Sequence, residues 1–158
     1  MALGEQEIRR GIDARTLAWH EAAAVKDHAV GLLKELGVTG VIAITNSLGM
    51  ELSRQVIGDD VTQLRPASVD AKTRTVLVSH RSTTIQNQRM VDSGQTREDF
   101  NGTLGNLRGG GVAIFADEEL KVFLGATAIS AGSEEIAEEV GDKAVRMAGF
   151  YTDIPQTK

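Results

Sequence analysis

The 158-residue sequence contains no cysteine, which excludes a disulfide framework, a thiolate metal site and a thiol nucleophile. Aromatic residues make up only 4% of the chain, too few for a surface on which nucleic-acid bases would stack. The formal net charge is −5, and no dense run of lysine and arginine occurs. The composition therefore argues against nucleic acid and against an anionic membrane surface as partners.

Long apolar runs are also missing. The first twenty residues carry charged side chains where a signal peptide would have an apolar core: Glu5, Glu7, Arg9, Arg10, Asp13 and Arg15. No segment is apolar over the length that a membrane-spanning helix requires. We therefore expect a cytoplasmic protein with a single domain, because 158 residues suffice to bury one substantial core.

The polar character of residues 1–12 predicts a flexible N-terminal arm. Residues 13–150 are expected to form the domain, and residues 151–158 a C-terminal tail. Within the domain, apolar residues recur three and four positions apart and predict a helix that starts at Asp13 and ends at Gly37.

Two further helices are indicated by their capping residues. Ser68 is the expected N-cap of one, with Asp70 in its first turn, and Ser133 is the expected N-cap of the last, which Gly149 ends. The inner stripe predicted for the helix after Ser68 consists of Val69, Thr73, Val76, Leu77 and His80. Residues 83–108 are polar and are expected to form one or two short helices and a long loop.

Four apolar segments are joined in pairs by turn residues and predict two β-hairpins. The strands are expected at Val38–Thr45 and Met50–Ile57, and at Val112–Phe115 and Leu120–Ser130. Hairpins require antiparallel pairing, so the predicted fold class is α+β: one antiparallel sheet built from two hairpins and flanked by helices.

Three consecutive glycines, Gly109–Gly111, open the third predicted strand. Glycines at such a place allow a backbone or a ligand to approach the main chain where side chains would block it. Their backbone N–H groups, with Asn106 and Arg108 just before them, are candidates to hold a carboxylate or a phosphate. The run does not match a dinucleotide-binding fingerprint, which needs Gly-x-Gly-x-x-Gly between a strand and a helix.

Several of these segments resemble, in order, the GlcG/HbpS-like proteins, a family often labelled haem-degrading or haem-binding that includes the C-terminal domain of PduO-type corrinoid adenosyltransferases. The matching segments are Val41–Asn46 for the first strand, Lys72–Thr83 for the helix that usually reads Lys-Ala-Arg-Thr-Ala, Gly110–Ile114 for Gly-Gly-Val-Pro-Ile, and Gly125–Ala131 for Gly-Ala-Ile-Gly-Val-Ser-Gly. The resemblance covers residues 13–148 in a single register.

The resemblance implies a profilin-like arrangement of three layers, assembly into homo-oligomers, and a small ligand that is haem or a corrinoid. The chain departs from the usual family pattern at four positions: Ala113 replaces proline, Ala128 and Ala131 replace glycines, and Asn46 replaces aspartate. If these positions line the ligand pocket of the family, the pocket of this chain is narrower and differently charged.

The candidate ligand-binding residues follow from the glycine run and the resemblance. They are Gly110 and Gly111 for backbone approach, Lys72 or Arg74 for an anionic edge of the ligand, and Arg108 and Asn46 beside them. Lys72 matches the recurrent lysine of the family, and a solvated helix face is the alternative for it.

Histidine is the side chain that titrates near neutral pH, and the chain has three. His80, at a predicted helix end beside the polar loop, is the candidate for an axial haem ligand or a proton shuttle. His28 is the other candidate axial ligand, although a packed core histidine is the simpler interpretation. His20 and His28 lie eight residues apart, without the four-residue spacing of a helical zinc pair, so no zinc site is predicted.

Two alternatives to ligand binding remain open. In one, the protein is an enzyme that acts by proton transfer on a small carboxylated metabolite, as an isomerase, hydratase or lyase. Arg74 or Arg108 would bind the carboxylate, and His80 or Asp99 would act as the acid or base. In the other, the protein is an interaction module whose apolar helix faces serve only for assembly.

Overall fold

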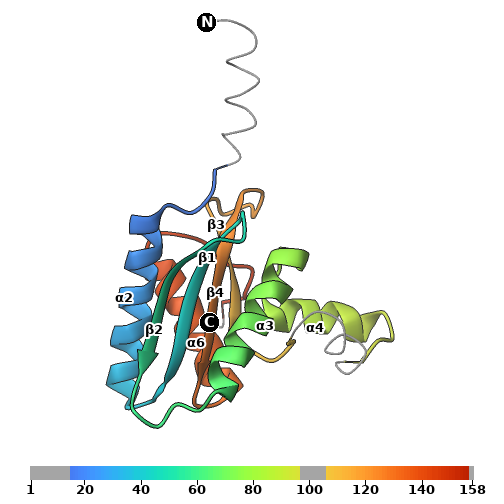
Figure 1. Cartoon of the computed structure of the whole chain (residues 1–158). Coiled ribbons are helices and arrows are strands. Elements are labelled where there is room, and N and C mark those ends of the chain that lie inside the picture. The colour runs from blue at the N-terminus through green and yellow to red at the C-terminus, as the bar shows by residue number, and fades with distance from the viewer. Residues whose placement is uncertain (1–14, 97–105, 157–158) are drawn as a thin grey trace, which may run out of the picture.

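The computed structural model describes residues 15–96 and 106–156. Within these ranges the chain forms one antiparallel sheet and the helices that pack on its two faces (Figure 1). The strands are β1 (Gly40–Asn46), β2 (Glu51–Ile57), β3 (Gly111–Phe115) and β4 (Phe123–Ala131). The helices are α2 (Trp19–Leu36), α3 (Leu64–Ser79), α4 (Thr83–Asp92) and α6 (Glu134–Met147).

The sheet has the order β2-β1-β4-β3. The first strand of the first hairpin, β1, therefore pairs with the last strand of the second hairpin, β4, at the centre of the sheet. All three strand pairs are antiparallel. Every residue of β1 is buried, because helices cover both faces of this central strand. The predicted α+β class with a sheet of two hairpins is confirmed.

Successive residues of the strands point to opposite faces of the sheet, and their side chains pack in two separate hydrophobic cores. Ile42, Ile44 and Ile129 point to the face on which α2 and α6 pack. Val41 and Ala128 point to the opposite face, where they meet Val69 of α3. Figure 1 shows α2 on one side of the sheet and α3 and α4 on the other, which confirms the predicted three layers.

The first two helices start at different residues from those expected. Asp13 lies outside the described residues, and α2 begins at Trp19, where the Glu21 carboxylate accepts the backbone N–H of Ala18 at 3.0 Å. Helix α3 begins at Leu64, so Ser68 is not its N-cap. The Ser68 hydroxyl accepts a hydrogen bond from Asn106 Nδ2 at 3.2 Å instead. Gly37 and the Ser133 cap are as predicted.

The inner face of α3 differs from the predicted stripe. The buried residues of the helix are Val69, Lys72, Thr75 and Val76, whereas Thr73 and Leu77 are half-buried and His80 is exposed. The prediction gave Lys72 no inner place because a charged side chain ordinarily faces water. Lys72 lies inside because its ammonium group finds a backbone acceptor in the sheet.

Three strands begin later than expected, and β3 begins one residue earlier, at Gly111. Strand β1 starts at Gly40 and β4 at Phe123. The second hairpin has a longer turn because the Asp117 carboxylate accepts the backbone N–H groups of Lys121 and Val122, at 3.0 and 2.9 Å. These bonds draw residues 120–122 into the turn rather than into the strand.

The C-terminal segment, Tyr151–Gln156, lies in the region that the sequence analysis assigned to a tail, and it packs on the domain. Tyr151 exchanges two backbone hydrogen bonds with Phe115 at the edge of the sheet, at 2.9 and 3.0 Å. The Asp153 carboxylate accepts the N–H of Ser82 at 2.9 Å and also bonds its hydroxyl, so it caps the start of α4. The segment thereby joins β3 to α4.

The glycine run passes between α3, α4 and α6 with no room for side chains. A Cβ atom on Gly109 would meet the Glu134 carbonyl, one on Gly110 would meet Ile129 O and Lys72 Nζ, and one on Gly111 would meet Thr83. The expected close approach therefore occurs, with the protein's own backbone and side chains as the neighbours.

We predict that Gly110→Ala lowers the free energy of unfolding by roughly 1–3 kcal/mol, the usual cost of a strained backbone position. Gly110 has φ +124°, and a Cβ atom there would lie 2.9 Å from Lys72 Nζ and closer still to the Ile129 carbonyl. The matched control is Gly31→Ala, because Gly31 lies within α2 with open space around it. Urea unfolding of both variants measures the difference, and equal stabilities would contradict the packing described.

Candidate functional site

A pocket of about 210 Å³ lies where the carboxyl end of β4, the start of α6 and the first half of α3 meet. We call it the basic pocket. Its lining residues are Arg65, Ser68, Lys72, Arg108, Ser130, Ala131, Gly132, Ser133, Glu134 and Ala137. Three cationic side chains and one carboxylate therefore line a single small pocket in a protein whose net charge is −5.

Lys72 is the most buried charged side chain of the pocket, with 4% of its surface exposed. Its Nζ atom donates a hydrogen bond to the carbonyl oxygen of Ile129 at 2.8 Å. On the other side of the same residue, Ile129 donates its N–H to the carbonyl of Gly110 at 2.9 Å. The lysine therefore connects α3 to the point where the glycine run joins the sheet.

Two arginines flank Lys72. Arg65 Nη1 donates to the Ser130 hydroxyl at 3.3 Å, and Arg65 and Arg108 form no ion pair with any residue of 15–96 or 106–156. The backbone of Arg108 is fixed, because its carbonyl accepts from Thr83 at 2.7 Å and its N–H donates to Asn106 at 2.9 Å. The Arg65 guanidinium is thus held by Ser130, and the backbone of Arg108 is held beside the pocket.

This crowding of cations changes the acidity of Lys72. Burial, followed by the positive charges of Arg65 and Arg108, lowers the pKa of Lys72 from 10.5 to about 8, while Glu134 opposes the shift. A buried ammonium beside two guanidinium groups is costly, and a bound anion would offset that cost. The electrostatics of the basic pocket therefore favour an anionic guest.

The start of α6 adds a second source of positive potential. Ser133 caps the helix, its hydroxyl accepting the N–H of Ile136 at 3.2 Å, and both Ser133 and Glu134 line the basic pocket. The N-terminus of a 14-residue helix carries partial positive charge. The hydroxyls of Ser68, Ser130 and Ser133 supply further donors.

His80 lies outside the basic pocket. It follows Lys72 by eight residues, which is about 12 Å along a helix axis. A separate pocket of about 330 Å³, which we call the His80 pocket, is lined by Ser79, His80, Arg81, Ile85, Phe115, Leu120 and Asp153. The imidazole is exposed and stacks on the Phe123 ring, with centroids 4.1 Å apart and planes within 8°.

Asp153 brings a carboxyl group to the His80 pocket. Burial raises the pKa of Asp153 above its ordinary value of 3.8, although its hydrogen bonds from Ser82 oppose the shift. Both carboxyl oxygens are used in capping α4. The sequence analysis missed this residue because the contact joins positions 71 residues apart and leaves no local pattern.

The other predicted site residues are dispersed. Asn46 lies at the far end of β1, where its side-chain oxygen accepts from the N–H groups of Leu48 and Met50 and closes the hairpin turn. Arg74 is exposed on α3 and does not line the basic pocket. His28 lies half-buried on α2, across the sheet from α3. Asp99 lies outside the described residues.

Of the predicted residues, the structure brings together Lys72, Arg108 and the glycine run. Gly111 N–H already donates to the Thr83 hydroxyl at 3.2 Å, so this amide is occupied. The sequence analysis missed Arg65 and Ser130. An arginine one residue before Pro66, in the first turn of a helix, carries no local signal of a partner 65 residues away.

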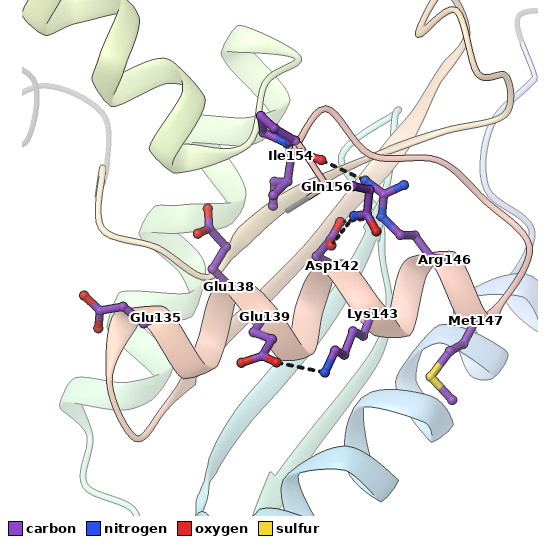
Figure 2. A pocket seen from close by; sticks show the side chains of 10 residues that line it. Glu135, Glu138, Glu139, Asp142, Lys143, Arg146, Met147, Ile154 and Gln156 are labelled. Carbon is purple, nitrogen blue, oxygen red and sulfur yellow. Dashed lines mark hydrogen bonds and ion pairs between the residues drawn. The ribbon is translucent and has the colours of Figure 1, made fainter. Parts of the chain in front are cut away.

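A third pocket, of about 730 Å³, lies elsewhere, on the outward face of α6 beside the C-terminal segment (Figure 2). Several of its polar groups are paired with one another. Arg146 Nε donates to Asp142 at 2.9 Å, and Lys143 donates to Glu139 at 2.8 Å. Gln156 donates to the second oxygen of Asp142 at 3.2 Å. The pocket lies between α6 and the C-terminal segment, and hydrogen bonds across it hold the segment on α6.

A comparison with known protein families shows which family the chain belongs to. Residues 17–146 match the model of the family described as "Haem degrading protein HbpS-like". The chain belongs to the HbpS-like family. A comparison with curated proteins finds no match.

Solved structures share the HbpS-like fold at low sequence identity. The structure described as a PduOC:heme complex has a TM-score of 0.72 at 21% identity, covering 87% of this chain and 98% of that one. A double mutant of HbpS from Streptomyces reticuli has a TM-score of 0.70 at 20% identity, covering 85% and 88%. The protein ORFY of Klebsiella pneumoniae has a TM-score of 0.71 at 18% identity, covering 85% and 91%.

Neither a metal site nor a membrane-spanning helix is found among the residues that the structure describes. Among residues 15–96 and 106–156, no three histidine, aspartate or glutamate side chains gather in a way that would hold a metal ion. None of the described helices combines the length and the apolar character needed to cross a membrane.

We predict that the stability of the protein depends on pH through Lys72. Because its pKa is about 8 in the folded state and 10.5 in the unfolded state, the folded protein loses this proton first. Stability relative to Lys72→Met should therefore rise as the pH increases from 8 to 10.5, by at most about 1.4 kcal/mol per pH unit, and be constant below pH 8, where both states hold the proton. Urea unfolding of both proteins from pH 7 to 10 tests this, and a constant difference would contradict it.

Proposed function

We propose that the protein binds a small molecule that carries a carboxylate or a phosphate, and that the basic pocket holds this anionic group. The observation that carries the proposal is the convergence of Arg65, Lys72 and Arg108 on one small pocket. Lys72 is buried and Arg65 is half-buried, and cations in such positions are ordinarily paired with anions. Glu134 is the one carboxylate that lines the pocket, so a guest anion would find an excess of positive charge.

The donors of the pocket suit planar or tetrahedral oxyanions. A guanidinium group presents its N–H donors in a fork that matches two oxygens of a carboxylate or a phosphate. The three serine hydroxyls and the α6 N-terminus supply further hydrogen bonds. A volume of about 210 Å³ is suited to a small metabolite or to one acidic arm of a larger ligand.

The test is an NMR titration of the ¹⁵N-labelled protein with inorganic phosphate and with pyruvate. We expect saturable shifts at residues 130–137 and near Lys72. Arg108→Gln should weaken binding roughly tenfold or more, since a hydrogen bond between charged groups contributes about 1.5–3 kcal/mol. The control is Arg74→Gln, which removes an exposed arginine of α3 that does not line the pocket. Absent shifts, or equal losses in both variants, would contradict the proposal.

Binding should also depend on pH through the same lysine. An anion prefers the charged form of Lys72, whose pKa is about 8. Affinity should therefore be highest below pH 8 and decline as the pH rises through this value. In Lys72→Arg, which keeps its charge, the decline should disappear, and a decline of equal size in that variant would assign the effect to another group.

The second candidate function is haem binding at the His80 pocket. The family description names haem, and PduOC was solved as a complex with heme. The donor set fits the group, because the pocket combines an exposed imidazole with the apolar side chains of Ile85, Phe115 and Leu120. His80 would be the axial ligand, and Arg81 would hold a propionate. Bound haem would supply an iron centre for redox chemistry.

A hemin titration followed by absorbance tests this second function. Wild-type protein should give a saturating one-to-one Soret shift that His80→Ala abolishes and that the control His28→Ala retains. No shift, or the same shift in His80→Ala, would reject His80 as the ligand. A parallel titration with hydroxocobalamin tests the corrinoid that the resemblance implies.

The remaining hypotheses stand as predictions. For the proton-transfer enzyme, Arg108 and His80 line different pockets, and Asp99 lies outside the described residues. Homo-oligomers are predicted from the resemblance, and sedimentation equilibrium of the full chain measures them. Exposed apolar side chains that a partner copy would cover include Trp19, Leu48 and Met50.

A further inference from the structure

We propose that Lys72 forms a Schiff base with the carbonyl carbon of a 2-oxo acid whose carboxylate is held by Arg65 and Arg108. The inference rests on the proposed function, because the anion site of the basic pocket would be the anchor for the substrate. It adds a reaction, a substrate class and a nucleophile to that site.

The position of the Lys72 amine is fixed to a degree that is unusual for a lysine. Its Nζ atom is held at 2.8 Å by the Ile129 carbonyl, and 96% of the residue's surface is removed from solvent, since 4% is exposed. Gly110 permits this position of the amine, because a Cβ atom there would lie 2.9 Å from Nζ. Lys72 is the single lysine among the residues that line the basic pocket.

The surroundings of the amine also favour its neutral, nucleophilic form. Burial and the charges of Arg65, on the same helix, and Arg108, before β3, lower the pKa of Lys72 to about 8, against the opposing effect of Glu134 on α6. About half of this amine is neutral at pH 8, compared with less than about 1% of a lysine of ordinary pKa. Lysines beside other cations are activated in this way for attack on carbonyl groups.

The reaction balances without an oxidant or a reductant. The lone pair of the neutral amine forms a bond to the carbonyl carbon, and the carbonyl oxygen leaves as water with the two hydrogens of the amine. The hydroxyls of Ser68, Ser130 and Ser133 and the carboxylate of Glu134 line the same pocket and can relay these protons. The imine nitrogen then takes up one proton from the solvent, and the resulting N–H can donate to the Ile129 carbonyl.

Borohydride trapping tests the inference. The full-length protein is incubated at pH 8 with pyruvate and sodium borohydride, which reduces an imine to a stable secondary amine. We expect the mass of one reduced pyruvate per chain, mapped by peptide mass spectrometry to Lys72. Acetone, which has the carbonyl but lacks the carboxylate, should give little adduct. An equal yield with acetone would overturn the inference.

The control variants separate Lys72 from the other amines. Lys143→Arg removes an exposed lysine of α6 and should leave the adduct unchanged, whereas Lys72→Arg should abolish it. Because the map is made on the wild-type protein, the assignment holds even if a Lys72 variant fails to fold. An adduct on the N-terminal amine or spread over exposed lysines, with none at Lys72, would overturn the inference.

The titration described for the proposed function distinguishes the two failures. Saturable pyruvate binding without a trapped adduct at Lys72 would overturn the Schiff base and leave anion binding in place. No binding and no adduct would overturn both. Binding together with an adduct at Lys72 that acetone does not form would support both.

Discussion

The hydrogen bond from Lys72 Nζ to the Ile129 carbonyl is the contact on which the other features of this protein depend. It joins α3 to the central strand β4 at the point where Gly110 enters the sheet. Glycine is required at that point because a Cβ atom on Gly110 would collide with Lys72 Nζ and the Ile129 carbonyl. The main chain of residues 109–111 passes between three helices. The basic pocket is the space left beside this junction.

The same contact explains why a structural lysine can also serve chemistry. A buried ammonium group must be hydrogen-bonded, and the Ile129 carbonyl satisfies one of its three donors. Burial, and after it the charges of the two arginines, disfavour the charged form, which is why the pKa of Lys72 falls to about 8. The two arginines would not stabilise an ammonium group that had only a structural role. In the proposed anion site, the charges of Arg65, Lys72 and Arg108 would all attract the bound anion.

Local sequence patterns predicted what short-range contacts determine. The two hairpins, the Ser133 cap and the helix end at Gly37 depend on residues a few positions apart, and the structure contains each of them. The inner face of α3 could not be predicted in the same way, because the burial of Lys72 depends on a carbonyl 57 residues away. Arg65 and Asp153 were missed for the same physical reason, since their partners are Ser130 and Ser82.

The departures of this chain from the usual family pattern show how its sites differ from those of its relatives. The resemblance places a proline where this chain has Ala113, and the Ala113 N–H donates to the Ser82 hydroxyl at 2.9 Å, a bond that proline cannot form. Ser82 also binds Asp153, so the alanine helps to hold the C-terminal segment beside the His80 pocket. Ala131, where the family has glycine, is among the residues that line the basic pocket, while its side chain packs in the core between the sheet, α2 and α6. The fold is shared at identities near 20%, and in this chain the basic pocket lies at the start of α3 and the His80 pocket at its end.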